Sequence, residues 1–350
     1  MRKYLAAVVQ QNASDLHIAV GFKPTLRIDG HLIPLIDEPV ITPDLGEELV
    51  LSVLDQGQRE KFLQLKELDF SFNFEDQARF RGDVYFQRGY MAAALRHIPS
   101  KIKTIEELSL PSILYQFSKL SQGFVIIVGP AGHGKSSTLA AILDEINHSR
   151  TEHIITIEDP IEYIFSNDQS IISQREVGSD TPDFHSALRL VLRQDPDVLM
   201  IGEMRDRESI STALTAAETG HLVFSTLHTN SAAQTINRII DTFPGDQQDQ
   251  VKTQLSASLA AIISERLVPK IGGGRTPAVE IMIVDSAIRN LIRERKTYQI
   301  DLMIETSLQE GMISLNRSLA DLVRSKTISL DDAVFYSQNP AELKILLERL

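Results

Sequence analysis

The chain has 350 residues, a formal net charge of −12 and no cysteine. Its hydrophobic and charged fractions, 43% and 23%, are typical of a soluble globular protein, and its length predicts two or three domains. The acidic balance argues against general affinity for nucleic acid or for an anionic membrane surface. The lack of cysteine excludes disulfides and cysteine–zinc modules, and no apolar run approaches the ~18 residues of a membrane span. We therefore expect a protein of the reducing cytosol, with no membrane span and no nucleic-acid partner.

Residues 1–98 are predicted to form a small α/β domain. In chain order, the pattern predicts a helix over 4–11, a strand over 14–18, a hairpin over 25–33, a helix over 42–54, and antiparallel strands over 69–74 and 78–87. The hairpin would turn at Asp29-Gly30, a dipeptide that favours two-residue loops. Pro99-Ser100-Lys101 breaks the strand pattern, so residues 99–111 are predicted to be a linker.

Residues 112–350 are predicted to form a second domain in which apolar strands alternate with helices. The expected strands are 124–128, 153–157, 198–201, 222–225 and 278–284. This alternation predicts a largely parallel sheet with helices on both faces, and the tail after residue 286 is predicted to be helical.

One octapeptide, Gly129-Pro130-Ala131-Gly132-His133-Gly134-Lys135-Ser136, fits the phosphate-loop pattern G-x-x-x-x-G-K-[ST]. It lies between a predicted buried strand and a predicted helix over 136–147, which is the context that phosphate binding needs. Glycines allow backbone amides to approach phosphate, and the helix N-terminus adds further N–H groups. Lys135 would reach the β- and γ-phosphates, and the Ser136 hydroxyl would ligate Mg²⁺. The alternative is a glycine-rich turn that fits the pattern by chance.

Acidic side chains follow two of the predicted strands, at the edge where ligands of parallel sheets collect. Glu158, Asp159 and Glu162 follow the strand 153–157, and near a metal-nucleotide they would hold Mg²⁺ through water or deprotonate the attacking water. Their alternative is an Asp-Pro turn with solvated acids. Glu203 follows the strand 198–201, as expected of a carboxylate presented to Mg²⁺ or to its water, and its alternative is a surface acid at a strand end.

Two histidines flank the strand 222–225, and arginines gather in the first domain. His221 and His228 are candidates to contact the γ-phosphate or the neighbouring carboxylates. The alternative for each is a purely structural role, and this alternative is stronger for His221. Two interpretations are open for Arg79, Arg81, Arg88 and Arg96. They belong to a solvated sheet face, or one of them donates to the γ-phosphate bound by a neighbouring subunit.

Together these segments resemble the secretion ATPases of bacterial type II and type IV pilus systems, and among them the twitching-motility retraction ATPases (PilT type). The matching motifs are Ala13–His17, Asp69–Phe72, Ala78–Arg81, Thr156–Glu162, Asp195–Asp206, Ala216–His228 and Ala287–Glu294. They span nearly the whole chain. The resemblance implies a hexameric ATP- and Mg²⁺-dependent motor with a PAS-like N-terminal α+β domain joined to a RecA-like domain. It also implies a cytoplasmic location, peripheral at the inner membrane, and a pilus inner-membrane platform protein as partner.

The resemblance also assigns residues. Nucleotide contacts would come from Gly129, Pro130, Ala131, Gly132, His133, Gly134, Lys135, Ser136 and Ser137, with Arg81, Arg96, Glu158, Asp159 and His221 in support. Glu203 would serve the Mg²⁺ site, Glu162 would be the general base, and His228 would sense the γ-phosphate.

The phosphate loop departs from the family pattern Gly-Pro-Thr-Gly-Ser-Gly-Lys-Ser-Thr, because Ala131, His133 and Ser137 replace Thr, Ser and Thr. His133 adds bulk and a titratable group near polyphosphate, which leaves room for a specialised paralogue that works with a homologous retraction ATPase. An alternative function is therefore a nucleotide-binding accessory subunit with weak catalysis. An extension-type ATPase is disfavoured because its usual four-cysteine zinc site is absent. The basic segment 289–296 is either a solvated helix end or a docking patch.

Overall fold

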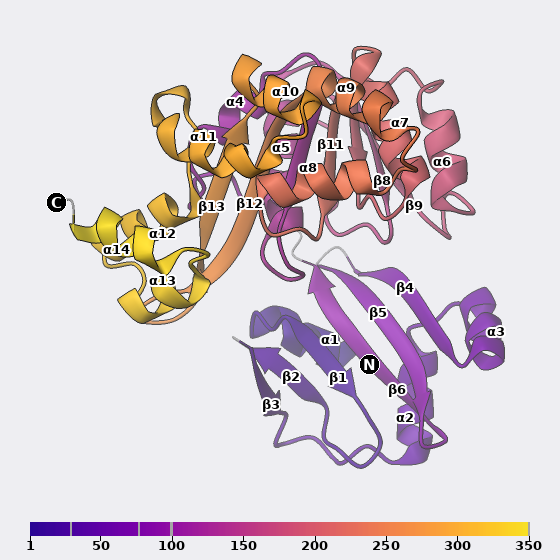
Figure 1. Cartoon of the computed structure of the whole chain (residues 1–350). Helices are drawn as coiled ribbons and strands as arrows, with labels where there is room; N and C mark the ends of the chain where they lie inside the picture. The colour runs from indigo at the N-terminus through magenta and orange to yellow at the C-terminus, as the bar shows by residue number, and fades with distance from the viewer. Residues whose placement is uncertain (29, 76–77, 99–100, 349–350) are drawn as a thin grey trace. The chain divides into compact units, whose positions relative to one another are not determined.

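The computed structural model describes residues 1–28, 30–75, 78–98 and 101–348, and it divides into two compact units (Figure 1). The first unit comprises Met1–Lys101 with Pro160–Ile164, and the second comprises Ile102–Asp159 with Phe165–Leu350. The second unit thus begins within the predicted linker 99–111, and a short later segment groups with the first unit. Of the predicted turn and linker, Asp29, Pro99 and Ser100 lie outside the described residues.

The first unit is a six-stranded antiparallel sheet with helices, in the order β3-β2-β1-β6-β5-β4. Its strands are β1 (Asp15–Ile18), β2 (Thr25–Ile28), β3 (His31–Pro34), β4 (Glu67–Phe74), β5 (Ala78–Gln87) and β6 (Tyr90–Ile98). Its helices are α1 (Arg2–Gln10), α2 (Pro43–Leu51) and α3 (Gln56–Leu65). This α+β architecture agrees with the expected N-terminal domain.

Sequence signals explain most of these elements. Thr42 caps α2 through its side chain and Pro43 opens the helix, as predicted, although α2 ends at Leu51 instead of residue 54. Phe80 and Val84 alternate into the core from β5. The prediction omitted β6 and α3. The latter begins with a capping box in which Asp55 and Gln58 bond each other's backbone.

The second unit contains a seven-stranded sheet in the order β13-β12-β7-β11-β10-β8-β9. Its strands are β7 (Gly123–Val128), β8 (His153–Glu158), β9 (Ile171–Glu176), β10 (Val198–Ile201), β11 (Leu222–Leu227), β12 (Leu259–Pro269) and β13 (Arg275–Ile283). All neighbouring strands pair in parallel except β12 and β13, which form an antiparallel hairpin. The prediction of a largely parallel sheet is confirmed, but β9 and β12 were not predicted.

Helices cover both faces of this sheet, as predicted. They are α4 (Leu114–Ser118), α5 (Lys135–Ser149), α6 (Phe184–Val191), α7 (Arg207–Glu218), α8 (Ala232–Asp241), α9 (Gln248–Ser258), α10 (Ser286–Arg293), α11 (Ile300–Thr306), α12 (Leu315–Arg324), α13 (Leu330–Tyr336) and α14 (Pro340–Glu348), with 3₁₀ turns at Thr297–Gln299 and Leu308–Glu310.

The interior strand β7 shows how side chains fill the space on the two faces of the sheet. Phe124, Ile126 and Val128 pack in one core with residues of α6 to α11, whereas Val125 and Ile127 pack in a second core with α4 and α5. All six residues of β7 are buried, which explains its continuous apolar sequence. The C-terminal helices α12, α13 and α14 form a smaller core with the β12–β13 hairpin. Among the described residues, no helix combines the length and apolarity that crossing a bilayer requires.

Candidate nucleotide site

The phosphate loop connects the carboxyl end of β7 to the N-terminus of α5. Its glycines adopt positive φ angles of 145° at Gly129, 75° at Gly132 and 99° at Gly134. A Cβ at Gly129 would lie 2.4 Å from the Glu265 carbonyl oxygen, and one at Gly134 would lie 2.3 Å from Glu265 Oε1. The loop therefore needs glycine for its backbone conformation and also for its close approach to β12.

Lys135 begins α5 and its side chain turns back onto the loop. Its Nζ donates to the carbonyl oxygens of Gly129 at 2.8 Å and Pro130 at 2.9 Å, and lies 3.3 Å from His228 Nδ1. The residue is 8% exposed. The buried ammonium thus lies beside the backbone amides of the helix N-terminus, where a phosphate anion would bind.

Glu203 lies two residues beyond the end of β10, in a turn fixed by both neighbouring strands. The Gly202 amide donates to Ile157 O of β8 at 2.9 Å, and Thr226 Oγ1 of β11 donates to Gly202 O at 2.6 Å. A Cβ at Gly202 would stand 3.2 Å from Ile157 O, so glycine permits this approach. The sheet register thereby holds Glu203 at the same edge as the phosphate loop.

A chain of polar contacts joins the loop to two acidic residues. His228 lies between Lys135 and Glu203, with its Nε2 3.2 Å from Glu203 Oε1. The other Glu203 oxygen accepts from Arg205 Nε at 2.9 Å, and Arg205 Nη1 lies 3.5 Å from Asp159 Oδ2. The structure thus brings together four predicted site residues from four segments. Arg205 was not assigned a role, although its position two residues after Glu203 within a matched motif was a signal.

Glu158, the other acid at the end of β8, is buried. It is 5% exposed, and its Oε1 accepts from Thr156 Oγ1 at 2.6 Å and from Gln174 Nε2 at 3.2 Å. These contacts fix the end of β8, so Glu158 supports the edge that presents Asp159.

Glu265 is a site residue that sequence reasoning missed. It lies on β12, is 2% exposed, and its Oε2 accepts from Thr138 Oγ1 of α5 at 2.7 Å. Burial raises the pKa of the Glu265 carboxyl to about 7, against the smaller opposing effects of the Thr138 hydroxyl and the Lys135 charge. The sequence offered no clear signal for it, because Glu265 stands between Ser264 and Arg266.

His133, the unusual residue of the loop, is docked on the same strand. Its Nδ1 accepts from the backbone amide of Leu267 at 3.0 Å. Burial lowers the pKa of His133, and the positive charges of Arg266, Arg275 and Lys135 lower it further. Because Nδ1 accepts from an amide, the ring proton in this arrangement lies on Nε2.

The remaining predicted residues lie elsewhere. His221 stands at the amino end of β11, where its carbonyl accepts from the Gly123 amide and its Nδ1 lies 2.9 Å from Ala216 O. This is the opposite end of β11 from His228, so the structure does not bring His221 to the phosphate loop; its contacts are local.

The two candidate arginines and the candidate base belong to the first unit. Arg81 lies 3.7 Å from Asp69, and Arg96 donates to Asp15 at 3.0 Å. Glu162 is exposed in the segment Pro160–Ile164, which groups with the first unit.

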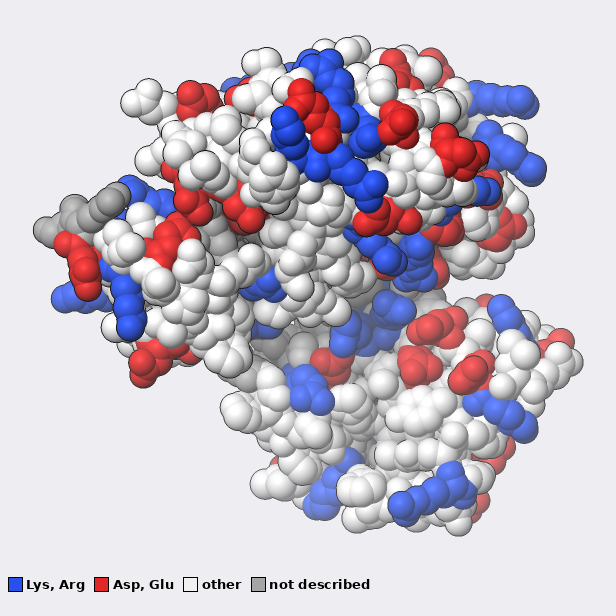
Figure 2. All heavy atoms as spheres, viewed as in Figure 1, with Lys and Arg blue, Asp and Glu red and all other residues white. Residues whose placement is uncertain are grey.

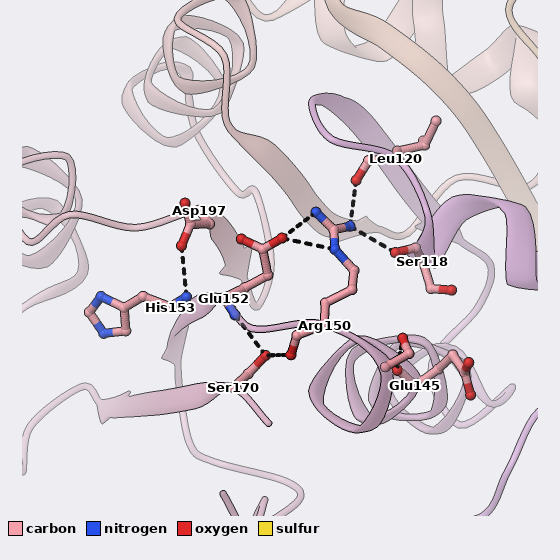
Figure 3. A network of polar contacts seen from close by, with 9 residues as sticks. Ser118, Leu120, Glu145, Arg150, Glu152, His153, Ser170 and Asp197 are labelled. Carbon is pink, nitrogen blue, oxygen red and sulfur yellow. Dashed lines mark hydrogen bonds and ion pairs between the residues drawn. The ribbon is translucent and has the colours of Figure 1, made fainter. Parts of the chain in front are cut away.

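The amino ends of the strands hold a separate polar network, drawn in Figure 3. Arg150, which follows α5, donates to Glu152 Oε1 and to the carbonyl oxygens of Ser118 and Leu120. Asp197 Oδ2 accepts from the His153 amide at 2.8 Å. These groups form hydrogen bonds with one another and join α4, α5 and β8. The edge of the sheet at the amino ends of the strands therefore has a structural role.

A largely parallel sheet with a glycine loop between an interior strand and a helix, a buried lysine at that helix and a glutamate beyond the next strand but one defines a RecA-like P-loop nucleotide hydrolase. Residues 106–274 match the family model described as type II/IV secretion system protein. The type IV pilus retraction ATPase PilT of Pseudomonas aeruginosa is 46% identical over 94% of this chain and 95% of its own length. A twitching motility protein of Neisseria gonorrhoeae is 43% identical over 95% of this chain and 88% of its own length.

The fold agrees with these similarities. The crystal structure of the pilus retraction motor PilT with bound ADP matches with a TM-score of 0.91 and 46% identity, covering 99% of both chains. The chain therefore belongs to the type II/IV secretion system ATPase family, in its pilus-retraction branch. It is an ATPase.

Proposed function

We propose that this chain is the subunit of a hexameric motor that hydrolyses Mg-ATP to retract type IV pili and so drives twitching motility. The observation that supports the proposal best is the contact chain from Lys135 through His228 to Glu203. It links the group that would hold the phosphates to the group that would hold the metal, which is what a nucleotide-sensing catalytic site requires.

The loop and its neighbours have assigned roles in this proposal. Backbone amides of Gly129 to Ser137 cradle the phosphates, and Lys135 leaves its carbonyl acceptors for the β- and γ-phosphate oxygens. Ser136 and Glu203 supply oxygen donors of the kind that Mg²⁺ prefers, at the sheet edge next to the loop. When bound, Mg²⁺ would neutralise charge that develops on the phosphates.

Residues around the loop complete the reaction. Glu162 acts as the general base, with Glu158 and Asp159 in support. Arg81 and Arg96 of the first unit contact phosphate. His228 senses the γ-phosphate, because a nucleotide that draws Lys135 away removes one of the His228 contacts. The local contacts of His221 give it no role here, and residues 99–111 act as the linker between the domains.

Motion would follow from unequal nucleotide affinity in two arrangements of the domains. A nearly complete switch needs roughly 5.5 kcal/mol of differential binding, which several charge-assisted phosphate contacts supply. Successive closures around a ring would act on a partner, for which we propose the pilus platform protein at the inner membrane. The chain would then work in the cytoplasm, peripheral to that membrane.

The second candidate function is an accessory subunit that binds nucleotide, turns it over weakly and works beside a homologous retraction ATPase. The observation that favours it is His133, which departs from the family loop and contacts β12. The retained Glu203 and Glu162 favour the motor.

The test measures phosphate release across a size-exclusion profile for the wild type, Lys135→Ala and Glu203→Gln. The motor requires turnover that coincides with the hexamer and falls at least 100-fold in both variants, with circular dichroism unchanged. Turnover in the wild type as low as in Glu203→Gln would favour the accessory subunit. Equal, substantial turnover in all three proteins would reject both functions for this site.

A further inference from the structure

The tip of the phosphate loop is tied to the β12–β13 hairpin by two side chains. His133 Nδ1 accepts from the Leu267 amide of β12 at 3.0 Å, and Arg275 Nη1 of β13 donates to Gly132 O at 3.4 Å. Closer to the sheet, Glu265 lies under both Gly129 and Gly134. Because Glu265 and Leu267 are two residues apart on one strand, the same stretch of β12 packs beneath the glycines of the loop and bonds to its tip.

We propose that His133 is a positioning residue that docks the loop tip on β12, so that the nucleotide-binding shape of the loop persists without nucleotide and bound ADP is released slowly. The proposal rests on nucleotide binding at this loop, but it does not depend on the reaction or on pilus retraction. It assigns a function to one of the three loop residues that depart from the family pattern.

The chemistry of the contact explains why a histidine suits it. The Leu267 amide is a donor, so Nδ1 must be unprotonated to accept from it. The positive charges of Arg266, Arg275 and Lys135 all oppose protonation of the imidazole. A serine hydroxyl at this position has a shorter reach, so the family residue would leave the Leu267 amide to water.

Docking reduces the number of loop conformations in the free protein, so less order must be gained when nucleotide binds. Loss of the dock removes one hydrogen bond, whose usual net strength corresponds to about a 3- to 10-fold change in an equilibrium or rate. We therefore expect ADP to dissociate about 3- to 10-fold faster when the acceptor is removed.

The experiment compares the wild type with a matched pair of variants. His133→Asn places its amide oxygen at the position of Nδ1 and preserves the acceptor, whereas His133→Gln moves it one bond further along. Hydrogen exchange of the Leu267 amide is measured on the nucleotide-free chain, and dissociation of a fluorescent ADP is followed by stopped flow.

The proposal requires that the wild type protects the Leu267 amide and releases ADP slowly. It also requires that His133→Asn preserves both properties and that His133→Gln loses both. The protection factor of the wild type should also fall as the pH drops through the lowered His133 pKa, while that of His133→Asn should not. Equal Leu267 protection in all three chains would overturn the proposal. A wild type that protects Leu267 but binds no ADP would contradict the nucleotide site, and with it the proposed slowing of release.

Discussion

Gly134 shows how tightly the phosphate loop is built at the scale of single residues. Its φ of +99° strains any L-residue, and an added Cβ would meet Glu265 Oε1 at 2.3 Å. Gly178 has a similar φ of +86° but nothing within 4 Å of an added Cβ. A substitution at Gly178 therefore introduces backbone strain alone, whereas one at Gly134 introduces backbone strain and steric overlap with Glu265.

We expect Gly178→Ala to lower stability by about 1–2 kcal/mol through strain alone. Gly134→Ala should cost more and should also abolish nucleotide binding, because Glu265 is buried and cannot move aside freely. Urea unfolding and ADP titration of both variants test this. Equal loss of stability with intact binding would contradict the packing described for Glu265.

Glu265 itself should make stability depend on pH. Its pKa of about 7 in the folded chain lies above the ordinary 4.5, so between these values the folded state binds more protons than the unfolded state. Stability should therefore fall as pH rises from about 4.5 to 7, by at most about 3 kcal/mol from this group. Glu265→Gln, which has no proton to lose, should lack this contribution.

The urea midpoint of Glu265→Gln relative to the wild type should accordingly rise between pH 5 and 7.5, with the exposed Glu60→Gln as control. Difference curves that stay flat for both variants would show that the Glu265 pKa is not raised.

Several site residues were predictable because their chemistry follows a local pattern. The loop from Gly129 to Ser136 is a contiguous motif, and Glu203 and His228 each follow an apolar strand. Glu265 was not predictable, since its hydrogen bond to Thr138 spans 127 positions and no local signal pairs them. The contact of His133 with Leu267 spans 134 positions, and its only local sign was an unusual residue type in the loop.

At the scale of elements, Arg150 fastens α4, α5 and β8 together (Figure 3). Arg150→Ala would leave the carbonyl oxygens of Ser118 and Leu120 without their charged donor. Because bonds to charged groups contribute more than neutral ones, we expect a loss of about 2–3 kcal/mol in stability. The exposed Lys119→Ala serves as control in the same urea measurement. A loss no larger than that of Lys119→Ala would show that water replaces the guanidinium.

Elements were predictable from the sequence where their pattern was strong. The buried strand β7 and the capped helix α2 gave clear signals. By contrast, β12 carries Ser264-Glu265-Arg266 in its middle and β9 is a half-buried edge strand that ends Ser-Gln-Arg-Glu, so neither shows the apolar run of a central strand. The predicted fold class is nevertheless confirmed. The missed strands β12 and β9 pair in parallel with β7 and β8, so they extend the predicted sheet without changing its type.

At the scale of the whole molecule, Lys and Arg side chains gather over α9 and α10 on an otherwise acidic protein (Figure 2). In the segment 289–296, Arg295 pairs with Asp241 at 2.8 Å and Lys296 with Glu294, whereas Arg289 and Arg293 are exposed on α10. Arg295 is engaged with Asp241, so the exposed arginines are the better probes of docking.

Reversal of both exposed charges, in Arg289→Glu with Arg293→Glu, should leave ATP hydrolysis intact and stop pilus retraction, because a partner surface would be repelled. Twitching of complemented cells and phosphate release by purified protein are the measurements. Lys119→Glu with Lys344→Glu makes the same change in net charge elsewhere. Normal twitching in the α10 variant would exclude this patch as the docking site.

The position of β12 beside β7 also has a consequence for synthesis. The ribosome releases the chain from its N-terminus, so residues 129–136 emerge long before Glu265 and Leu267. Until then the glycine loop lacks the surface on which it rests, and β7 is exposed along one side. A nascent or prematurely terminated chain should therefore be unable to retain nucleotide, so half-made subunits would not compete with finished ones for ATP.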